Sequence, residues 1–346
     1  MVICTNNIAV ELTNYLSSHR HDKVFVLTDT HTHAKCLPLL EIAFLDNVLS
    51  ITIEPGDTNK TIDQVRTVWD VLSNNGASRN SLLINLGGGM VTDLGGFAGA
   101  TFKRGLHTLN IPTTLMASVD AAVGGKTGIN YLELKNEIGS FYQPDCVMID
   151  CRFLQTLDHE NMLSGYAEML KHGLISEKKT FYEVLTFNVE QADLVKLNEL
   201  VGTSIAIKQR FVEADPKEQG IRKVLNLGHT VGHAFESLSF INNHPVLHGH
   251  AVAAGLICEL YLSHKACGLP IEPLRQVSNF IHSYYPPIVF SCGAYEALYE
   301  LMMHDKKNED GNIRFTLLKG IGDIRINQEV SKSLVLESLD FYREIF

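Results

Sequence analysis

The sequence predicts an α/β domain with a mainly parallel sheet, followed by a mainly α-helical domain. Three observations indicate this fold. With 346 residues the chain is too long for a single small core. Its first half alternates short apolar runs with amphipathic stretches, and long helical patterns dominate after about residue 150. We place the boundary near residue 155, which divides the chain into residues 1–155 and 156–346.

The strands of the first half are short apolar runs, and a helical pattern lies between two of them. In residues 61–76 apolar side chains recur at helical spacing, and Gly76 is a plausible stop. Strands that alternate with helices imply βαβ units and a parallel sheet. The predicted strands are VFVLTD (24–29), LLINLGGG (82–89), LHTLNIP (106–112) and CVMID (146–150).

The second half contains few strand-like segments. Residues 157–175 begin a series of long helical patterns, IRFTLLKG (313–320) is the best strand candidate, and HDKKNEDGN (304–312) is predicted to be a charged loop. No internal repeat or low-complexity tract is visible.

The overall charge and the cysteines limit the class of protein. A formal net charge of −10 argues against general binding to nucleic acid or to an anionic membrane, so an anionic ligand needs a local basic cluster. The seven cysteines are odd in number and form no C-x-x-C, which argues against disulfides and a thiolate zinc site. With no signal-like start and no apolar run of about 18 residues, we expect a cytoplasmic protein.

The first motif, LGGGMVTDLGGFAGA (86–100), places glycines between a strand and a small-residue helix. Backbone N–H groups at such a helix start can cradle phosphate oxygens. The pattern is not G-x-G-x-x-G, and two interpretations stay open: a nucleotide site, or a tight turn in which Gly95, Gly96 and Gly99 allow close helix packing.

Basic residues gather after this motif. Lys103, Arg104, Lys126 and Lys135 fall within a short span of an acidic protein, and lysines beside glycines in loops suit phosphate or carboxylate recognition. Each one alone is also compatible with a solvated loop lysine. Their clustering favours an anion site.

A further pair lies in GYAEMLKHG (165–173), where Glu168 and Lys171 share one face of a predicted helix. A surface salt bridge is the usual interpretation of such a pair.

Histidines gather in LNLGHTVGHAFE (225–236) and HPVLHGHAVAAG (244–255). Imidazole is the commonest metal ligand, and spacing alone favours both His229 and His233 as ligands. No glutamate lies between them, so this is not H-E-x-x-H. Ordinary histidines at a helix start are the alternative. The five histidines of this region are His229, His233, His244, His248 and His250.

Six segments together make the chain similar to the 3-dehydroquinate synthase family, in the family's order from about residue 54 to 315. The resemblance implies a Rossmann-like NAD domain, a helical C-terminal domain, a divalent metal (Zn²⁺, or Co²⁺ in substitution) and a homodimer. The segments are LGGGMVTDLGGFAGATFKRG, IPTTLMASVDAAVGGKTGIN, LKNEIGSFYQP, GYAEMLKHGLI, RKVLNLGHTVGHAFE and HGHAVAAG.

The implied activity belongs to the shikimate pathway of aromatic amino acid biosynthesis. A member of the family is a lyase that converts 3-deoxy-D-arabino-heptulosonate 7-phosphate to 3-dehydroquinate and phosphate. NAD oxidises C5 transiently, phosphate leaves by β-elimination, hydride returns, and an intramolecular aldol closes the ring.

The resemblance also implies roles for individual residues. Glu168, His229 and His248 match the metal ligands, so His233 would face the substrate, and Arg104 would reach the substrate phosphate from the partner subunit. The implied NAD contacts are Asp57, Lys60, Gly88, Gly89, Asp93, Thr113, Thr114, Lys126, Lys135, Phe153 and Thr156. The implied catalytic and substrate-binding residues are Arg104, Asp120, Lys126, Lys135, Asn136, Lys171, Lys208, Arg222, Asn226, His233 and Lys306.

One position departs from the family pattern, because His250 stands where a carboxylate usually follows the third ligand. Cyclases that act on sedoheptulose 7-phosphate can show the same HGH, so such a cyclase is the alternative enzyme. Arg222 and Asn226 match the carboxylate-binding pattern of dehydroquinate synthases and favour that family. We interpret His250 as a local variant that can orient a ligand. More distant alternatives are a glycerol dehydrogenase-like enzyme and a catalytically silent NAD-binding homologue.

Overall fold

A computed structural model describes residues 1–40, 48–132, 134–304 and 312–346. It contains two compact units. Unit 1 is Met1–Asp158 with Asp193–Ile205, and unit 2 is His159–Ala192 with Ala206–Phe346. The long helix α7 (Leu194–Ala214) therefore contributes to both units, which a single boundary near residue 155 does not anticipate. The functions assigned to residues 1–155 and 156–346 stay predictions.

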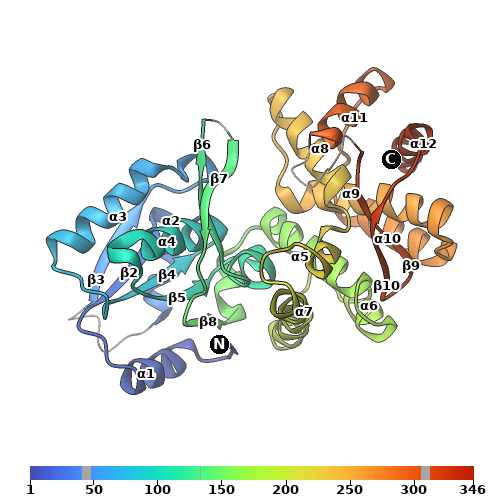
Figure 1. Cartoon of the computed structure of the whole chain (residues 1–346). Helices are drawn as coiled ribbons and strands as arrows, with labels where there is room; N and C mark the ends of the chain where they lie inside the picture. Colours follow the sequence, from blue (N-terminus) through green and yellow to red (C-terminus); the bar gives the residue numbers. More distant parts are fainter. Residues whose placement is uncertain (41–47, 133, 305–311) are drawn as a thin grey trace. The chain divides into compact units, whose positions relative to one another are not determined.

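Unit 1 contains the predicted parallel sheet (Figure 1). Six strands pair in the order β1-β8-β5-β4-β2-β3, and every pair is parallel. Four of them were predicted from their apolar runs, whereas β1 and β3 were not. The strands are β1 (Val2–Cys4), β2 (Val24–Asp29), β3 (Val48–Ile53), β4 (Leu82–Gly87), β5 (His107–Pro112) and β8 (Cys146–Ile149).

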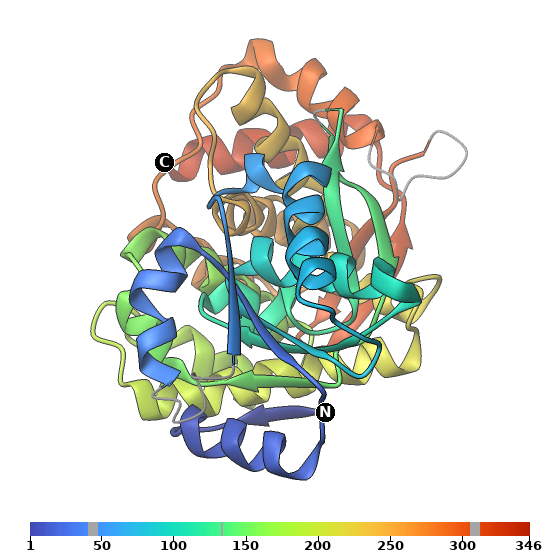
Figure 2. The ribbon, with the colours of Figure 1, turned by 90° about the vertical axis from the view of Figure 1, so that its left-hand side faces the viewer.

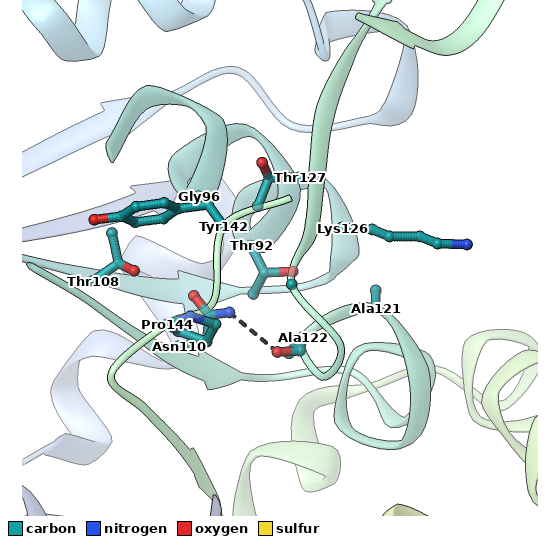
Figure 3. Close-up of a pocket in the computed structure, with 11 residues that line it drawn as sticks. Thr92, Gly96, Thr108, Asn110, Ala121, Ala122, Lys126, Thr127, Tyr142 and Pro144 are labelled. Carbon is teal, nitrogen blue, oxygen red and sulfur yellow. Dashed lines mark hydrogen bonds between the residues drawn. The ribbon is translucent and has the colours of Figure 1, made fainter. Parts of the chain in front are cut away.

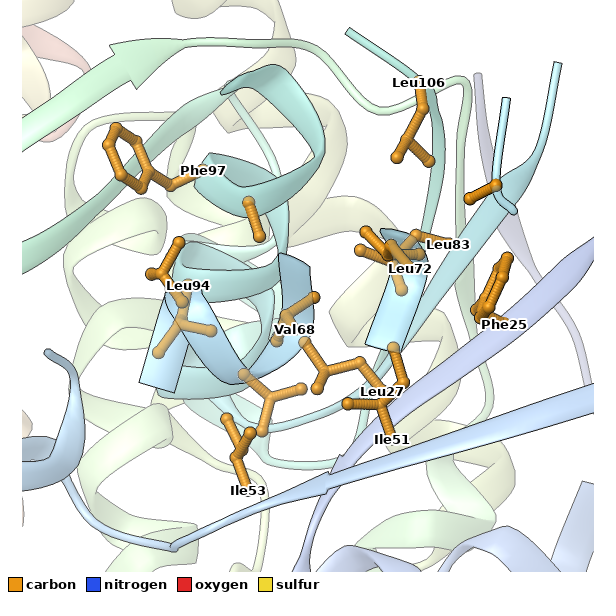
Figure 4. Packing of buried hydrophobic residues seen from close by; sticks show 14 of the residues in the cluster. Phe25, Leu27, Ile51, Ile53, Val68, Leu72, Leu83, Leu94, Phe97 and Leu106 are labelled. Carbon is orange, nitrogen blue, oxygen red and sulfur yellow. The ribbon is translucent and has the colours of Figure 1, made fainter. Parts of the chain in front are cut away.

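The sheet buries both faces, which explains why its central strands are apolar at consecutive positions. Side chains alternate across β2: Val26 packs in one apolar cluster, and Phe25 and Leu27 pack in the other. Figure 4 shows Phe25 and Leu27 near Leu72 of α3. The helices of this unit before α7 are α1 (Ile8–Ser18), α2 (Thr30–Lys35), α3 (Ile62–Asn74) and α4 (Gly89–Thr101).

Lys126 and Lys135, which were expected in loops beside glycines, lie in a hairpin instead. The strands β6 (Lys126–Tyr131) and β7 (Leu134–Phe141) pair antiparallel and lie side by side in both views (Figure 1, Figure 2). Gly128 and Gly139 lie opposite each other in the hairpin. A Cβ on Gly139 would come within 2.2 Å of the Thr127 carbonyl oxygen. Glycine is therefore needed for the close approach of two backbones, and this hides the strand pattern in the sequence.

Unit 2 is mainly helical, as predicted, with one small antiparallel pair of strands. That pair is β9 (Phe315–Gly320) and β10 (Asp323–Gln328), so the predicted strand 313–320 is confirmed. The further helices are α5 (His159–Leu174), α6 (Lys178–Leu185), α8 (His229–Ile241), α9 (His248–Leu262), α10 (Ile271–Tyr284), α11 (Tyr295–Met303) and α12 (Lys332–Ile345). Most of the predicted charged loop 304–312 lies outside the described residues.

Glycines bring three of these helices into backbone contact. A Cβ at Gly255 of α9 would lie 2.1 Å from the Gly228 carbonyl oxygen, at the start of α8. A Cβ at Gly249 would lie 1.8 Å from the Ser164 carbonyl oxygen of α5. Because no other residue fits these positions, the starts of α8 and α9 are held against each other and against α5.

The described residues include the cysteines and the longest helices of the chain, which bear on disulfide bonds and on membrane spans. All seven cysteines lie among the described residues as free thiols. Within the described ranges no helix has the length and apolar character needed to cross a membrane.

Candidate active site

In unit 1 the glycine turn lies where the order of the sheet reverses. After β2 the chain adds β3 on one side and β4 on the other, so the carboxyl ends of β2 and β4 flank a topological switch point. Ligands of open α/β sheets bind at such points. Gly88 is the N-cap of α4, so no side chain caps the first N–H groups of this helix. A Cβ at Gly88 would come within 3.1 Å of Thr114 Cγ2.

The later glycines of α4 have a different role. A Cβ at Gly95 would lie 2.0 Å from Asn85 Oδ1, one at Gly96 2.5 Å from Thr127 Cγ2, and one at Gly99 2.5 Å from Thr108 Cγ2. The close-packing interpretation is thus confirmed for these three glycines. The turn at Gly88 and Gly89 keeps the features of a phosphate cradle.

A small pocket lies between α4 and the hairpin (Figure 3). Thr92, Asn110 and Thr127 line it, and the Asn110 amide donates a hydrogen bond to the Ala122 carbonyl at 3.2 Å. The Lys126 side chain extends away from the other labelled residues. Lys126 also lines the pocket, and the other lining residues are uncharged. The pocket therefore contains one of the basic residues that the sequence predicted for an anion site.

Predicted cofactor contacts gather around Lys60. Its side chain is buried, and its Nζ lies 2.5 Å from Asp93 Oδ2 and 2.5 Å from Asn136 Oδ1. Lys135 Nζ lies 3.3 Å from Asp57 Oδ2 at the edge of the same group. The structure thus brings together five residues, although Asn136 was expected beside the substrate and contacts Lys60 here.

Two of the three threonines predicted to contact NAD, Thr113 and Thr114, lie beside the glycine turn. The Thr113 N–H donates to the Gly87 carbonyl at 3.0 Å, and Thr114 Oγ1 accepts the Ala117 N–H at 3.1 Å. Phe153 is different, because its side chain is 1% exposed and packs in an apolar cluster of the sheet. Thr156 Oγ1 donates to the Phe153 carbonyl at 2.9 Å.

Arg104 is exposed on a conformationally unusual turn. Lys103 has φ 48°, Arg104 φ 67° and Gly105 φ 116°, all in the left-handed region. Asp120 lies in the short π-helix Ala117–Ala121, and Lys126 is exposed at the start of β6.

Unit 2 contains the predicted metal ligands. Glu168 and Lys171 form an ion pair on α5 with side chains 0% and 1% exposed, so the surface-salt-bridge interpretation is wrong. Glu168 Oε1 lies 3.3 Å from His229 Nε2 and 3.9 Å from His248 Nε2. A carboxylate and two imidazoles therefore face one point.

The outer nitrogens of both imidazoles are occupied. His229 Nδ1 lies 3.1 Å from the Leu227 carbonyl oxygen, so this nitrogen carries the proton. His248 Nδ1 lies 3.0 Å from Glu236 Oε2. Partners of this kind turn Nε2 of each ring toward a metal.

The charges around Glu168 favour its ionised form. Burial by itself raises the pKa of the carboxyl, but the Lys171 ammonium and the His229 and His248 imidazoles lower that pKa well below its ordinary value. An ionised carboxylate is the form that binds a metal.

His233 lies close to the same point. One ring nitrogen from each of His229, His233 and His248 falls within 4.8 Å of the others, so a set of three histidines is a geometric alternative. The structure brings all three histidines together beside the Glu168 carboxylate.

The other predicted substrate residues of unit 2 are mostly buried. Lys208 and Arg222 are 5% and 3% exposed, and Asn226 Nδ2 donates to Glu218 Oε1 at 2.9 Å. Arg222 and Asn226 share the short 3₁₀ helix Ile221–Asn226, which ends just before α8. Lys306 lies outside the described residues.

His250 points toward α5. Its Nε2 donates to the Glu160 carbonyl at 3.2 Å, and its ring packs edge-on against Tyr285, with the ring centroids 5.4 Å apart. It therefore contacts the helix that carries Glu168, and its role in orienting a ligand stays a prediction.

Three acidic residues near these sites were not singled out from the sequence. Asp29 ends β2 at the switch point, Glu236 contacts His248, and Glu259 is 0% exposed within α9. A usable signal existed for Asp29, which ends an apolar strand, and for Glu259, an isolated charge in the apolar run LICELYL. Glu236 carried no signal beyond helical spacing.

Solved structures confirm the fold. A 2-deoxy-scyllo-inosose synthase complexed with carbaglucose-6-phosphate, NAD⁺ and Co²⁺ superposes with a TM-score of 0.86 at 21% identity, covering 99% of this chain and 96% of that one. A 2-epi-5-epi-valiolone synthase from Streptomyces hygroscopicus subsp. jinggangensis, with NAD⁺ and Zn²⁺ bound, has a TM-score of 0.86 at 23% identity and the same coverage.

Sequence relatives are more specific. A 3-dehydroquinate synthase from Parabacteroides distasonis is 62% identical over 100% of this chain and 98% of its own length, and one from Clostridium tetani is 36% identical over 92% and 86%. The family profiles "3-dehydroquinate synthase N-terminal" and "3-dehydroquinate synthase C-terminal" match residues 50–164 and 165–308. This chain belongs to the 3-dehydroquinate synthase family.

Proposed function

We propose that the chain converts 3-deoxy-D-arabino-heptulosonate 7-phosphate to 3-dehydroquinate and phosphate, with NAD and a divalent metal as cofactors. The observation that supports this most directly is the buried Glu168 carboxylate facing His229 and His248 beside Lys171. It occurs in a chain that is 62% identical over its full length to a 3-dehydroquinate synthase.

The donor set of unit 2 fits a metal such as Zn²⁺ or Co²⁺. Two ligand atoms about 2.1 Å from a tetrahedral metal lie about 3.4 Å apart. The carboxylate oxygen lies 3.3 Å and 3.9 Å from the two ring nitrogens, so Glu168, His229 and His248 would hold the ion. A bound divalent metal supplies Lewis acidity toward hydroxyl and carbonyl oxygens of the substrate.

The glycine turn of unit 1 fits the pyrophosphate of NAD. A side chain at Gly88 would fill the space beside Thr114, and the backbone N–H groups that begin α4 suit phosphate oxygens. Lys60 keeps Asp93 in place at 2.5 Å, one turn into the same helix. Bound NAD⁺ supplies a hydride acceptor and, once reduced, returns the hydride.

The basic side chains of unit 2 suit the two anionic groups of the substrate. Lys171, Lys208 and Arg222 are buried cations, and buried positive charge favours the binding of carboxylate and phosphate. Lys171 is held by Glu168, and Asn226 by Glu218, so both side chains are oriented before substrate binds. We assign His233 to a hydrogen bond with the substrate.

The remaining assignments also rest on the family. We propose that the protein is a cytoplasmic homodimer in which Arg104 of one subunit reaches the substrate phosphate in the other. The exposure of Arg104 on its left-handed turn supports a role outside its own unit.

A cyclase that acts on sedoheptulose 7-phosphate is the second candidate, because of His250. The bond of His250 to the Glu160 carbonyl supports a positioning role for this side chain within unit 2. The HGH sequence therefore does not by itself indicate a different substrate.

One paired assay tests the proposal. Purified protein with NAD⁺ and Zn²⁺ or Co²⁺ should release inorganic phosphate from 3-deoxy-D-arabino-heptulosonate 7-phosphate and not from sedoheptulose 7-phosphate, and 3-dehydroquinate should accumulate. Release from sedoheptulose 7-phosphate alone would support the cyclase. Binding of NAD without turnover of either sugar would identify a silent homologue.

A further inference from the structure

Glu259 is a buried carboxylate in an otherwise apolar stretch of α9. Its side chain is 0% exposed. Oε2 accepts the Gly228 N–H at 2.6 Å, and Oε1 accepts the Val231 N–H at 3.1 Å. Burial of a carboxylate is unfavourable unless hydrogen bonds compensate it. These two bonds therefore contribute to keeping the Glu259 carboxylate stable inside the protein.

Together the two bonds replace a capping box. In a capping box the N-cap side chain accepts the N–H of the third helical residue, and that residue's side chain accepts the N-cap N–H. Here the N-cap is Gly228 and the third residue is Val231, and neither has a side chain that can accept. Glu259 supplies both acceptors from the neighbouring helix.

The packing of α9 explains why the cap comes from outside. Gly228 has φ 80°, and a Cβ there would lie 2.8 Å from the Leu256 side chain and 3.1 Å from the Val252 carbonyl oxygen. No capping serine, threonine or aspartate fits at this position. The first turn of α8 therefore depends on α9 for its unsatisfied N–H groups.

One peptide group connects Glu259 to a predicted metal ligand. The N–H of Gly228 bonds Glu259, and the carbonyl of the same peptide, which belongs to Leu227, lies 3.1 Å from His229 Nδ1. Because a peptide group is planar, fixing its N–H also fixes the direction of its carbonyl. That carbonyl holds the proton on Nδ1 and leaves Nε2 of His229 facing Glu168.

We propose that Glu259 is a positioning residue for metal binding, which acts on His229 through the Leu227–Gly228 peptide. The inference rests on the proposed metal site. His248 begins the helix that carries Glu259, eleven residues earlier and on the same face, since eleven residues make about three turns. One helix thus carries one ligand and the group that orients another.

The test is the metal affinity of Glu259→Gln, measured by chelator competition with Zn²⁺ and compared with the parent and with His229→Ala. Loss of an outer partner of a metal-binding histidine lowers affinity about 10–100-fold, and we expect a decrease in this range. The visible spectrum of the Co²⁺-loaded variant should also shift, because the orientation of one ligand changes.

Tyr342→Phe is the matched control. The Tyr342 hydroxyl is buried and accepts the Ile288 N–H at 2.8 Å, so this variant also loses one buried bond to a backbone N–H in unit 2. We expect a similar decrease in Tm with unchanged Zn²⁺ affinity and an unchanged Co²⁺ spectrum. Glu259→Asp, which keeps the charge, should recover part of the affinity.

The outcomes separate the two proposals. If the parent binds Zn²⁺ in a manner that His229→Ala abolishes, and Glu259→Gln binds as tightly as the parent, the positioning role is wrong and the metal site stands. If the parent binds no Zn²⁺, both are overturned. If neither Glu259 variant folds, the residue serves stability alone and the positioning role is likewise overturned.

Discussion

The Lys171 ammonium contacts the Glu168 carboxylate one turn away on α5, and both side chains are buried. At the same spacing, the pair Lys196–Glu199 is exposed on both sides, with the two charged atoms 3.0 Å apart. Identical spacing in the sequence thus produces a site in one helix and a solvated surface pair in another. This contrast supplies a matched comparison.

Lys171→Met should destabilise the metal-free protein by about 3–5 kcal/mol, because it removes the buried ammonium that compensates the Glu168 carboxylate and leaves only the two neighbouring imidazoles to do so. Lys196→Met should cost less than about 1 kcal/mol, since water screens the exposed pair. Urea unfolding of both variants measures the difference. Equal losses would show that the burial of the first pair has no energetic consequence.

His229→Ala should lose its metal on dialysis, whereas His233→Ala should keep near-parental metal content and lose turnover. The reason is that Glu168 Oε1 lies 3.3 Å from His229 Nε2, while His233 is assigned to the substrate. Metal analysis after dialysis, with phosphate release as the second measurement, tests the assignment. Equal metal loss in both variants would favour the three-histidine set instead.

Gly88→Ala should weaken NAD binding about tenfold or more without unfolding the protein. The added Cβ enters the space beside Thr114, and the loss of one hydrogen bond to a charged phosphate is worth about 1.5–3 kcal/mol. Isothermal titration with NAD⁺ measures the change. Gly202→Ala, in α7 with its nearest contact 3.7 Å away at Cys4 Sγ, is the control and should bind NAD as the parent does.

Tyr15→Phe should make unit 1 less sensitive to alkaline pH. Burial, followed by the Asp145 charge, raises the pKa of Tyr15 from 10.0 to about 12. Because the folded protein holds this proton more tightly than the unfolded chain, the associated stability is complete below pH 10 and is lost as pH rises toward 12.

The measurement for Tyr15 is the urea midpoint as a function of pH. Between pH 10 and 12 the midpoint of the parent should fall more steeply than that of Tyr15→Phe. Tyr131→Phe, at an exposed tyrosine of the hairpin, should follow the parent. Parallel curves for all three proteins would rule out a contribution from Tyr15.

The sequence predicts best where a local pattern has one physical outcome. Mostly apolar runs such as LLINLG, in which Asn85 is the polar exception, favour buried strands between two helical layers, and β4 is confirmed at Leu82–Gly87. The sequence predicts secondary structure less well where glycines allow two backbones to approach closely. The hairpin β6–β7 was missed because Gly128 and Gly139 weaken the strand pattern, and they are needed only once the two strands are paired.

The candidate site also contains some features that the sequence predicts and others that depend on tertiary contacts. By itself the sequence determined the two kinds of domain, the glycine turn at the end of a strand and, through the matching motifs, the family. Only the tertiary structure decided that Glu168 and Lys171 are buried and that Glu259 caps α8. The physical reason is that burial and hydrogen bonding between helices depend on contacts far apart in the chain, which spacing along one helix does not encode.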